Sequence, residues 1–499
     1  MPGPTPARPV ASARGTPAAV RTVSSARTLR PRWQPTRLLD LPEDVLVTAF
    51  ALWPAESLAC ASVTCRELHA ILDMAVALGV ARLGYDALPP PRGTHDTRTH
   101  RLRHLQRLAA RRPQTLSAGA TTSLCVVGSS MVLAWGGSDH EDSVEVTVPS
   151  PVAFPRMEVS IREVAAGDTH CLLLAADGVY SWGVDNSFGQ LGHGDIKPRS
   201  APERIEAFAA SGVTHVAQVA CGRQHSLVLS VDGRVHSFGR GSLGRLGLGG
   251  IEDMLSPQPI DEFISEPTCA TCDVSTCSAY GAPPRVVLLS AGLFHSLAVT
   301  EGGSLYSWGS GTNGRLGHGD TVMQLRPRRV EALAELDVVD ASAGSGHSVA
   351  VSATGVLHTW GQGYNGRLGH GNQETKPQPA EVEALFGQHI TRAVAGSDFT
   401  ICVTERGAAY SFGNGGNTGT MWWGRGWEGG APCLLEPAHI KELADLRIDL
   451  LAAGSAHAML RSTSGALFTF GAGAHGQLGH GDLQEQLVPK KVELQLEVE

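Results

Sequence analysis

The sequence predicts an all-β protein, a seven-bladed β-propeller, with a small α-helical module before it. The main observation is a small residue followed by Gly, which recurs seven times before an apolar segment. An aromatic residue followed by Gly comes 15 or 16 residues after each of these glycines. A second observation is composition, because 59 of 499 residues are Gly, which indicates many tight turns. The glycines are Gly119, Gly167, Gly222, Gly292, Gly344, Gly396 and Gly454, and the aromatic residues are Trp135, Trp182, Phe238, Trp308, Trp360, Phe412 and Phe470.

Each repeat is predicted to begin with a β-hairpin. In the third repeat, apolar residues 226–230 are followed by Asp232-Gly233, a turn pair, and by a second strand at 234–238. A further block is LGHGD at 191–195, 316–320 and 478–482, with the variants LGHGN at 368–372 and LGLGG at 246–250. A mean repeat of about 56 residues accommodates four short strands. Radial closure leaves only short sheet edges, and an open β-solenoid is the alternative fold.

Ring closure is predicted from the two ends of the repeat region. The last repeat ends near 489–492, where other repeats continue toward their next Ala-Gly strand. Residues 116–135 supply such a strand, so we expect both ends of the region to share one blade.

These repeated residues resemble the regulator of chromosome condensation repeat family over about residues 115–499. The resemblance implies a propeller, and relatives with different functions: exchange factors for Ran-type GTPases, a plant ultraviolet-B photoreceptor and repeats within ubiquitin ligases. The photoreceptor uses clustered Trp in slots that hold no Trp here. Those slots contain Asp168, Arg223, Leu293, Ser345, Ser397 and Ser455.

Residues 1–37 have a composition that does not build a packed core. They contain seven Arg and no acidic residue, with much Pro, Ala, Ser and Thr. We expect a disordered tail, with an organelle transit peptide and a nucleic-acid-binding arm as alternatives. Because the whole chain has a net charge of −8, the rest is acidic, which argues against general nucleic-acid binding outside this tail.

Residues 38–85 are predicted to form short helices. Pro42 followed by acidic residues indicates a helix start, and Pro54 opens a second helix. A third helix is expected from Val63 to Leu72. Such a small module needs a partner or the propeller to bury its apolar side chains.

The helical module resembles an F-box over about residues 38–72, in Leu41-Pro42, Pro54 with Leu58, and Val63-x-Cys65-Arg66. It departs from the family at Leu68, where Trp is common. The resemblance implies docking to a Skp-type adaptor of a cullin ubiquitin ligase, and a helical cap on the propeller is the alternative. The implied adaptor-binding residues are Leu41, Pro42, Leu46, Leu58, Val63 and Leu68.

Residues 86–114 are predicted to connect the module to the propeller. Pro89–Pro91 stiffens the start of this linker, and 97–112 is a candidate basic helix beneath the ring.

Histidines and cysteines raise the question of metal or acid–base chemistry. Most of the 20 His fall into two repeated slots, which indicates a structural role, with bonds across blades. Cys269, Cys272 and Cys277 form a Cys-x-x-Cys pair with a third Cys, a weak zinc candidate. Free thiols in a flexible loop are the alternative, and we expect no cofactor. The His slots are His170, His225, His295, His347 and His457, and His193, His318, His370 and His480.

The sixth repeat departs from the pattern. Phe399 replaces His, and a Gly-rich segment with Trp422, Trp423, Arg425 and Trp427 replaces LGHGD. Because Trp and Arg are common in binding hot spots, this segment is a candidate partner-binding loop. The alternative is that the Trp rings fill the space of the missing motif.

The favoured function is a non-catalytic adaptor: the F-box docks to the ligase and the propeller binds an unknown client protein for ubiquitination. The alternatives are a guanine-nucleotide exchange factor for a Ran-like small GTPase and a general scaffold. No nucleophile–base set or phosphate loop is found, so we expect no enzyme activity. We expect a cytoplasmic or nuclear protein, with organelle import open, and no membrane span because no apolar run approaches about 20 residues.

Overall fold

The structure is a computed structural model, and it describes residues 107–108, 111, 113–137, 146–154, 159–213, 215–261, 284–414 and 433–494. All of these belong to one compact unit, Val47–Glu499. The F-box-like segment 38–72, the cysteines at 269–277 and the Trp-containing segment 415–432 lie outside the described residues.

The described chain forms seven antiparallel four-stranded sheets, each built from four consecutive strands. Blade 1 contains β1 (Leu116–Ala118), β2 (Thr122–Val127), β3 (Met131–Gly136) and β4 (Val146–Pro151), and blade 2 contains β5 (Ile161–Ala166), β6 (His170–Ala175), β7 (Gly178–Gly183) and β8 (Arg199–Arg204). Blade 3 contains β9 (Val216–Cys221), β10 (His225–Ser230), β11 (Val235–Gly239) and β12 (Met254–Pro259), and blade 4 contains β13 (Val286–Ala291), β14 (His295–Thr300), β15 (Leu305–Gly309) and β16 (Gln324–Arg329). Blade 5 contains β17 (Val338–Ala343), β18 (His347–Ser352), β19 (Leu357–Gly361) and β20 (Lys376–Glu381), and blade 6 contains β21 (Ile390–Ala395), β22 (Phe399–Thr404), β23 (Ala409–Gly413) and β24 (Leu434–His439). Blade 7 contains β25 (Ile448–Ala453), β26 (His457–Ser462), β27 (Leu467–Gly471) and β28 (Gln486–Lys491).

Short helical turns connect the strands. They are α6 (Glu206–Ala210), η1 (Ser242–Gly244), η2 (Thr312–Gly314), η3 (Glu331–Leu333), η4 (Tyr364–Gly366), η5 (Glu383–Leu385) and η6 (Lys441–Leu443).

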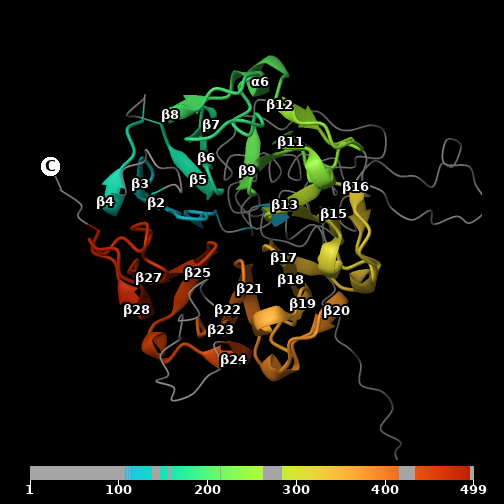
Figure 1. Ribbon diagram of the computed structural model, residues 1–499, viewed down its shortest axis with the longest axis vertical. Coiled ribbons are helices and arrows are strands. Elements are labelled where there is room, and N and C mark those ends of the chain that lie inside the picture. Colours follow the sequence, from blue (N-terminus) through green and yellow to red (C-terminus); the bar gives the residue numbers. More distant parts are fainter. Residues whose placement is uncertain are drawn as a thin grey trace, which may run out of the picture. The chain divides into compact units, whose positions relative to one another are not determined.

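The seven blades close into a ring (Figure 1), and a cavity lies between their inner strands. The first strand of each blade contacts the first strand of the next, and β25 contacts β1 in the same way. The predicted seven-bladed propeller is therefore confirmed.

The expectation that both ends share one blade is wrong. β28 pairs with β27 as the fourth strand of blade 7, and the three-residue β1 pairs with β2 as the first strand of blade 1. The physical reason is that each Ala-Gly pair ends the first strand of its own blade, so the last repeat lacks no strand. The ring is closed by side-chain and turn contacts between two complete blades.

Burial follows strand position within a blade. Second strands such as β10 and β18 are buried along their whole length, because sheets cover both of their faces. Fourth strands such as β20 and β28 are largely exposed at the rim. This explains why the second strands are apolar runs without alternation.

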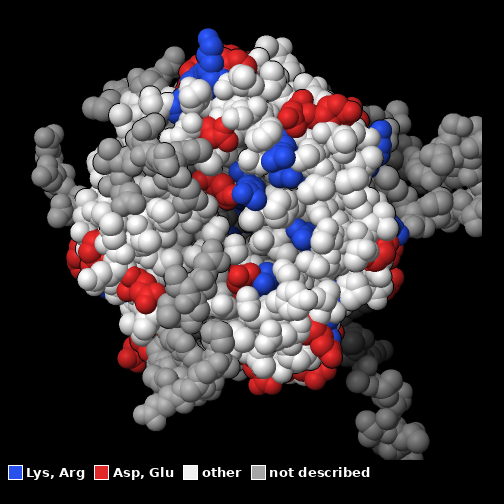
Figure 2. All heavy atoms as spheres, in the orientation of Figure 1, with Lys and Arg blue, Asp and Glu red and all other residues white. Residues whose placement is uncertain are grey.

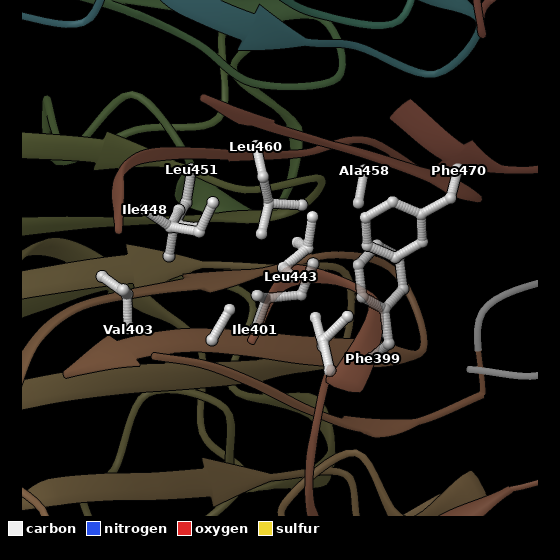
Figure 3. Close-up of a cluster of buried hydrophobic side chains, with 11 residues drawn as sticks. Phe399, Ile401, Val403, Leu443, Ile448, Leu451, Ala458, Leu460 and Phe470 are labelled. Atoms are coloured by element: carbon white, nitrogen blue, oxygen red, sulfur yellow. The ribbon is translucent and has the colours of Figure 1, made fainter. Parts of the chain in front are cut away.

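Buried apolar side chains form hydrophobic cores between neighbouring blades. In Figure 3, Phe399 of blade 6 lies against Phe470 of blade 7, beside Ala458. At the closure, Leu116 and Trp135 of blade 1 pack with Leu450 and Met459 of blade 7. The junction between the chain's two ends therefore has a hydrophobic core like that of the other interfaces.

Candidate protein-binding face of the propeller

Small side chains line part of the channel at the ring axis, together with larger ones such as Arg111, Asp340 and Arg392. The last residue of each first strand faces it, and a cavity of about 170 Å³ runs between the inner strands. At the end of the channel next to the turns between first and second strands, a further cavity of about 70 Å³ remains. The residues that end the first strands line both cavities, and they are Ala118, Ala166, Cys221, Ala291, Ala343, Ala395 and Ala453.

The repeated glycine is required because the blades crowd together at the axis. A Cβ on Gly292 would lie 2.4 Å from the carbonyl oxygen of Gly344 in the next blade. The backbone N–H of Leu293 donates to that same oxygen over 3.2 Å. The turn between first and second strands therefore touches its neighbour directly, and any side chain at Gly292 would separate the two blades.

The first histidine slot links neighbouring blades. Each His Nε2 lies 2.7–3.0 Å from a Ser or Thr hydroxyl at the start of the next blade's second strand. All five rings are buried, and burial lowers the pKa of His170 and His457 to about 4. The prediction of bonds across blades is confirmed for this slot. The pairs are His170–Ser226, His225–Ser296, His295–Ser348, His347–Thr400 and His457–Ser123.

The second histidine slot bonds within its own blade. His318 Nε2, for example, lies 3.0 Å from Ser307 Oγ, which also donates to Leu316 O. The same pairing recurs at His193, His370 and His480. This slot is also structural, but it braces the loop between third and fourth strands rather than the blade interface.

Three repeated arginines fasten the loops between third and fourth strands to the next blade. Arg245 Nη1 donates to Leu293 O, Arg315 Nη1 to Ser345 O and Arg367 Nη1 to Ser397 O, over 2.8–3.1 Å. The carbonyl oxygen of each arginine in turn accepts the hydroxyl of the next blade. Blades 2 and 7 carry Gln190 and Gln477 at this position.

These loops and the turns between first and second strands lie at the same end of the blades. We call this end of the ring the channel-mouth face. Figure 2 shows Lys and Arg side chains grouped around the middle of the ring, with a few carboxylates beside them. We define the arginine cluster as Arg223, Arg240, Arg245, Arg315 and Arg367 of this face.

The arginine cluster has more positive charge than its neighbours neutralise. Arg223 pairs with Asp168 at 3.1 Å, and Arg367 pairs with Asp398 at 2.6 Å. Among the described residues, Arg240, Arg245 and Arg315 form no ion pair. Burial, with a further contribution from Arg240 and Arg223, lowers the pKa of Arg245 to about 10. Burial likewise lowers the pKa of Arg315 to about 10, so both of these buried side chains remain charged at neutral pH.

Aromatic rings accompany the arginines. The Arg240 guanidinium lies 4.4 Å from the centre of the Phe188 ring. Phe294 has the guanidinium groups of Arg223, Arg245 and Arg315 at 5.5–5.8 Å from its ring centre. Cations over aromatic faces hold the guanidinium planes in place.

Exposed apolar side chains border the same face. Leu243 is 41% exposed and Tyr364 is 60% exposed, both in the short turns that precede the buried arginines. Leu243 also has a φ of 64°, where the equivalent residues of blades 4 and 5 are Asn313 and Asn365. A Leu in the left-handed region is strained, and strain of this kind concentrates at functional sites.

The opposite mouth of the channel is crossed by the segment that precedes blade 1. Residues 107–108 are helical, and Leu108 is buried. Arg107 donates to both carboxylate oxygens of Asp337, and Arg111 pairs with the buried Glu163. These contacts of the basic linker attach it to blades 2 and 5.

The residues that the sequence singled out for binding all lie outside the described ranges. They are Leu41, Pro42, Leu46, Leu58, Val63, Leu68, Trp422, Trp423, Arg425, Trp427, Cys269, Cys272 and Cys277. The described flank of the Trp-containing segment, Asn414, donates its N–H to Asp398 O, so the chain leaves the channel-mouth face there.

The arginine cluster was missed from the sequence, although it left a signal. The repeated Gly-Arg-Leu-Gly at 244–247, 314–317 and 366–369 differs from Gly-Gln-Leu-Gly in blades 2 and 7. The difference places three arginines in consecutive blades. Arg223, by contrast, was noted only as a position that lacks Trp.

Among the described residues, no group of acidic, His or Cys side chains is arranged to hold a metal ion. In the same part of the chain, no helix has the length and apolar character needed to span a membrane.

A closed ring of seven four-stranded sheets defines a repeat propeller, and one of its faces carries the arginine cluster beside Phe188 and Phe294. The RCC1-like domain model matches residues 79–428, and the regulator of chromosome condensation (RCC1) repeat model matches 464–498. The chain belongs to the RCC1-like family.

Relatives in this family have diverse names. The ultraviolet-B receptor UVR8 of Arabidopsis thaliana is 32% identical over 389 residues, which cover 76% of this chain and 81% of the receptor. The human E3 ubiquitin-protein ligase HERC2 is 33% identical over 317 residues, 63% of this chain but only 6% of the ligase. The structure of Prp20p from Saccharomyces cerevisiae has a TM-score of 0.60 at 23% identity, covering 74% of this chain and 87% of that one, a likeness in fold alone.

Proposed function

We propose that this protein is a non-catalytic recruiting subunit. Its channel-mouth face binds a client protein, and its F-box-like segment 38–72 binds a Skp-type adaptor of a cullin ubiquitin ligase. The single observation that supports client binding most is the arginine cluster, which combines unpaired charge, aromatic rings and exposed apolar residues on one face. Arg and aromatic residues are enriched in protein interfaces.

The roles of the repeated polar residues favour binding over catalysis. Both histidine slots hold blades or loops together, and three of the arginines fasten one blade to the next. Burial lowers the pKa of the interblade histidines well below the neutral range, so these rings are poor proton carriers at neutral pH. The conspicuous titratable residues of the described ring are thus explained by its architecture.

The ubiquitin-ligase link is supported by the F-box-like residues, in particular Leu41-Pro42 and Val63-x-Cys65-Arg66. HERC2 is named as a ubiquitin ligase, but the match covers only a small part of it. The Trp-containing segment 415–432 adds to the proposal, because the chain enters it from the channel-mouth face at Asn414.

An exchange factor for a Ran-like small GTPase is the second candidate. The observation in its favour is the fold shared with Prp20p, whose structural report names binding to Gsp1p and histones. This candidate gives no role to the F-box-like segment. Ultraviolet-B reception is not proposed, because none of the six corresponding slots holds Trp.

Co-purification of the full chain with a Skp-type adaptor tests the proposal. We expect the parent to retain the adaptor and the Leu41→Asp, Leu46→Asp variant to lose it, because buried charge opposes docking of an apolar surface. A Val20→Asp, Val23→Asp variant adds the same charge in the tail and should bind like the parent. Failure of the folded parent to bind, together with accelerated nucleotide release from a Ran-type GTPase, would replace the adaptor function by exchange.

A further inference from the structure

We infer that the arginine cluster binds an acidic, extended segment of the client protein, with carboxylates of the client beside Arg223 and Arg240 and an apolar side chain beside Leu243. This inference rests on the proposed client binding and specifies its chemistry.

The first support is the local charge. Two of the five arginines pair with carboxylates, Asp168 and Asp398, and Asp253 acts on Arg245 without an ion pair, so three arginines lack an ion-pair partner among the described residues. The whole chain is acidic, with a net charge of −8, so this cationic face is a local exception. A ligand that supplies carboxylates would complete the neutralisation.

The second support is that the accessible arginines are held in position. Arg223 is 46% exposed and is fixed by Asp168. Arg240 donates to Gln224 Oε1 over 2.7 Å and stacks on Phe188. A guanidinium that is already ordered loses little conformational freedom when it binds, which favours bidentate recognition of carboxylates.

The buried arginines contribute charge rather than contacts. Arg245 and Arg315 are 2% and 6% exposed, and they fasten blades 3 and 4 to their neighbours. A client cannot pair with them extensively, but their charges raise the potential above the face. We therefore place the direct contacts at Arg223 and Arg240.

The third support is Leu243. Its side chain is exposed in a strained backbone conformation, between Arg240 and Arg245 in sequence. Asn occupies the equivalent left-handed position in blades 4 and 5 without comparable strain. An exposed apolar side chain next to guanidinium groups suits a peptide in which acidic and apolar residues alternate.

A nucleic acid is the other polyanion that a cationic face can attract. The observations favour a peptide, because Asp168 and Asp398 interrupt the cationic face: a phosphate backbone carries a charge at every nucleotide, whereas a peptide can place neutral residues beside these two carboxylates. An exposed apolar residue at Leu243 also has no partner on such a backbone.

The test is direct binding of a fluorescein-labelled peptide that alternates Glu and Leu to the full chain, measured by anisotropy at low and physiological salt. We expect saturable binding that weakens with salt, and a loss of at least about tenfold in affinity for Arg240→Glu and for Arg223→Glu. The matched control is Arg234→Glu, because Arg234 lies in the same blade, on the turn at the opposite end, with 58% exposure. It should bind like the parent.

Several outcomes would overturn the inference. They are no binding by the parent at low salt, equal losses in Arg234→Glu and Arg240→Glu, and preferential binding of a labelled single-stranded oligonucleotide. The peptide assay contains no Skp-type adaptor, so a negative result would not change the outcome of adaptor co-purification. The two experiments therefore test this inference and the proposed function separately. Urea unfolding of each variant identifies a loss that is due to misfolding, and Arg240→Gln then provides a milder substitution that must also weaken binding.

Discussion

His457 Nε2 in the last blade lies 2.8 Å from Ser123 Oγ in the first, so the ring is closed by the same histidine–hydroxyl pair that joins four other blade interfaces. The two remaining interfaces lack both members of the pair. Phe399 stands in the histidine position opposite Ala458, and Thr122 stands opposite Cys171. Where the ring nitrogen is missing, the hydroxyl is missing too, so no interface is left with one half of a buried polar pair.

Ser123→Ala tests the closing pair. We expect it to lower the free energy of unfolding by about 1–3 kcal/mol, because His457 Nε2 would be buried without its partner. Urea unfolding followed by Trp fluorescence measures the change. Thr463→Ala, at an exposed position of blade 7, is the control and should stay within about 0.5 kcal/mol of the parent. Equal stability of Ser123→Ala and the control would contradict a role for this bond in closure.

Phe399→His tests whether the Phe399–Ala458 pair replaces, as a unit, the histidine–hydroxyl pair of the other blade interfaces. The single variant places a ring nitrogen opposite Ala458, and we expect a loss of about 2–4 kcal/mol from lost packing against Phe470 and an unpaired polar atom. Adding Ala458→Ser should restore part of this loss by supplying the hydroxyl. A double-mutant cycle measures the coupling, and strictly additive effects would mean that the two positions act independently.

The pH dependence of stability follows from the interblade histidines. Burial lowers the pKa of His347 well below its usual value, with a further contribution from Arg367. At mildly acidic pH, His347 is therefore neutral in the folded protein but binds a proton in the unfolded chain. The free energy of unfolding should therefore fall as pH drops below about 6.5, by up to about 1.4 kcal/mol per pH unit for each such histidine. It should be unaffected by these groups above pH 7.

A paired variant isolates one histidine from the other titrating groups. Burial raises the pKa of Glu163 and Asp340, so protonation of these two groups increases the free energy of unfolding as the pH falls, opposite to the effect of the histidines. His347→Phe combined with Thr400→Ala copies the Phe399–Ala458 interface and removes one titration. Thermal denaturation between pH 7.5 and 5 should show a shallower decline for this variant than for the parent. Parallel curves would show that His347 does not titrate on unfolding.

The fold was largely predictable from the sequence, because its determinants are local and repeated. The Gly–aromatic spacing located all seven blades, and repetition of the histidines indicated their role across blades. The closure was mispredicted because the boundary between repeats depends on which strand the Ala-Gly pair ends, and β1 is only three residues long. The repeated Gly-Arg-Leu-Gly marks three members of the arginine cluster, but the whole cluster was not recognised, since Arg223 and Arg245 belong to different parts of the repeat. They converge with Phe294 only when two blades pack.

Gly292→Ala tests the crowding at the channel axis. The added Cβ would meet Gly344 O at 2.4 Å, and we expect a loss of about 1–3 kcal/mol or more in the free energy of unfolding. Gly302→Ala is a suitable control, because its Cβ would have open space apart from Thr300 Oγ1 at 4.0 Å. Guanidinium unfolding of both variants measures the difference. A Gly292→Ala protein as stable as the control would show that the blades can move apart at the axis without cost.

Leu243→Asn tests the strain on the channel-mouth face. Leu in the left-handed region costs about 1–2 kcal/mol, whereas Asn tolerates this conformation, as Asn313 does at the equivalent position of blade 4. The Leu243→Asn variant should therefore unfold at a higher urea concentration than the parent, and Asn313→Leu should unfold at a lower one by a similar free energy. The stabilised Leu243→Asn variant should at the same time bind the Glu-Leu peptide more weakly, because it removes the apolar contact. Higher stability together with weaker peptide binding in Leu243→Asn would show that Leu243 serves recognition at the expense of stability. Lower stability together with weaker binding would show instead that Leu243 supports the structure of the turn.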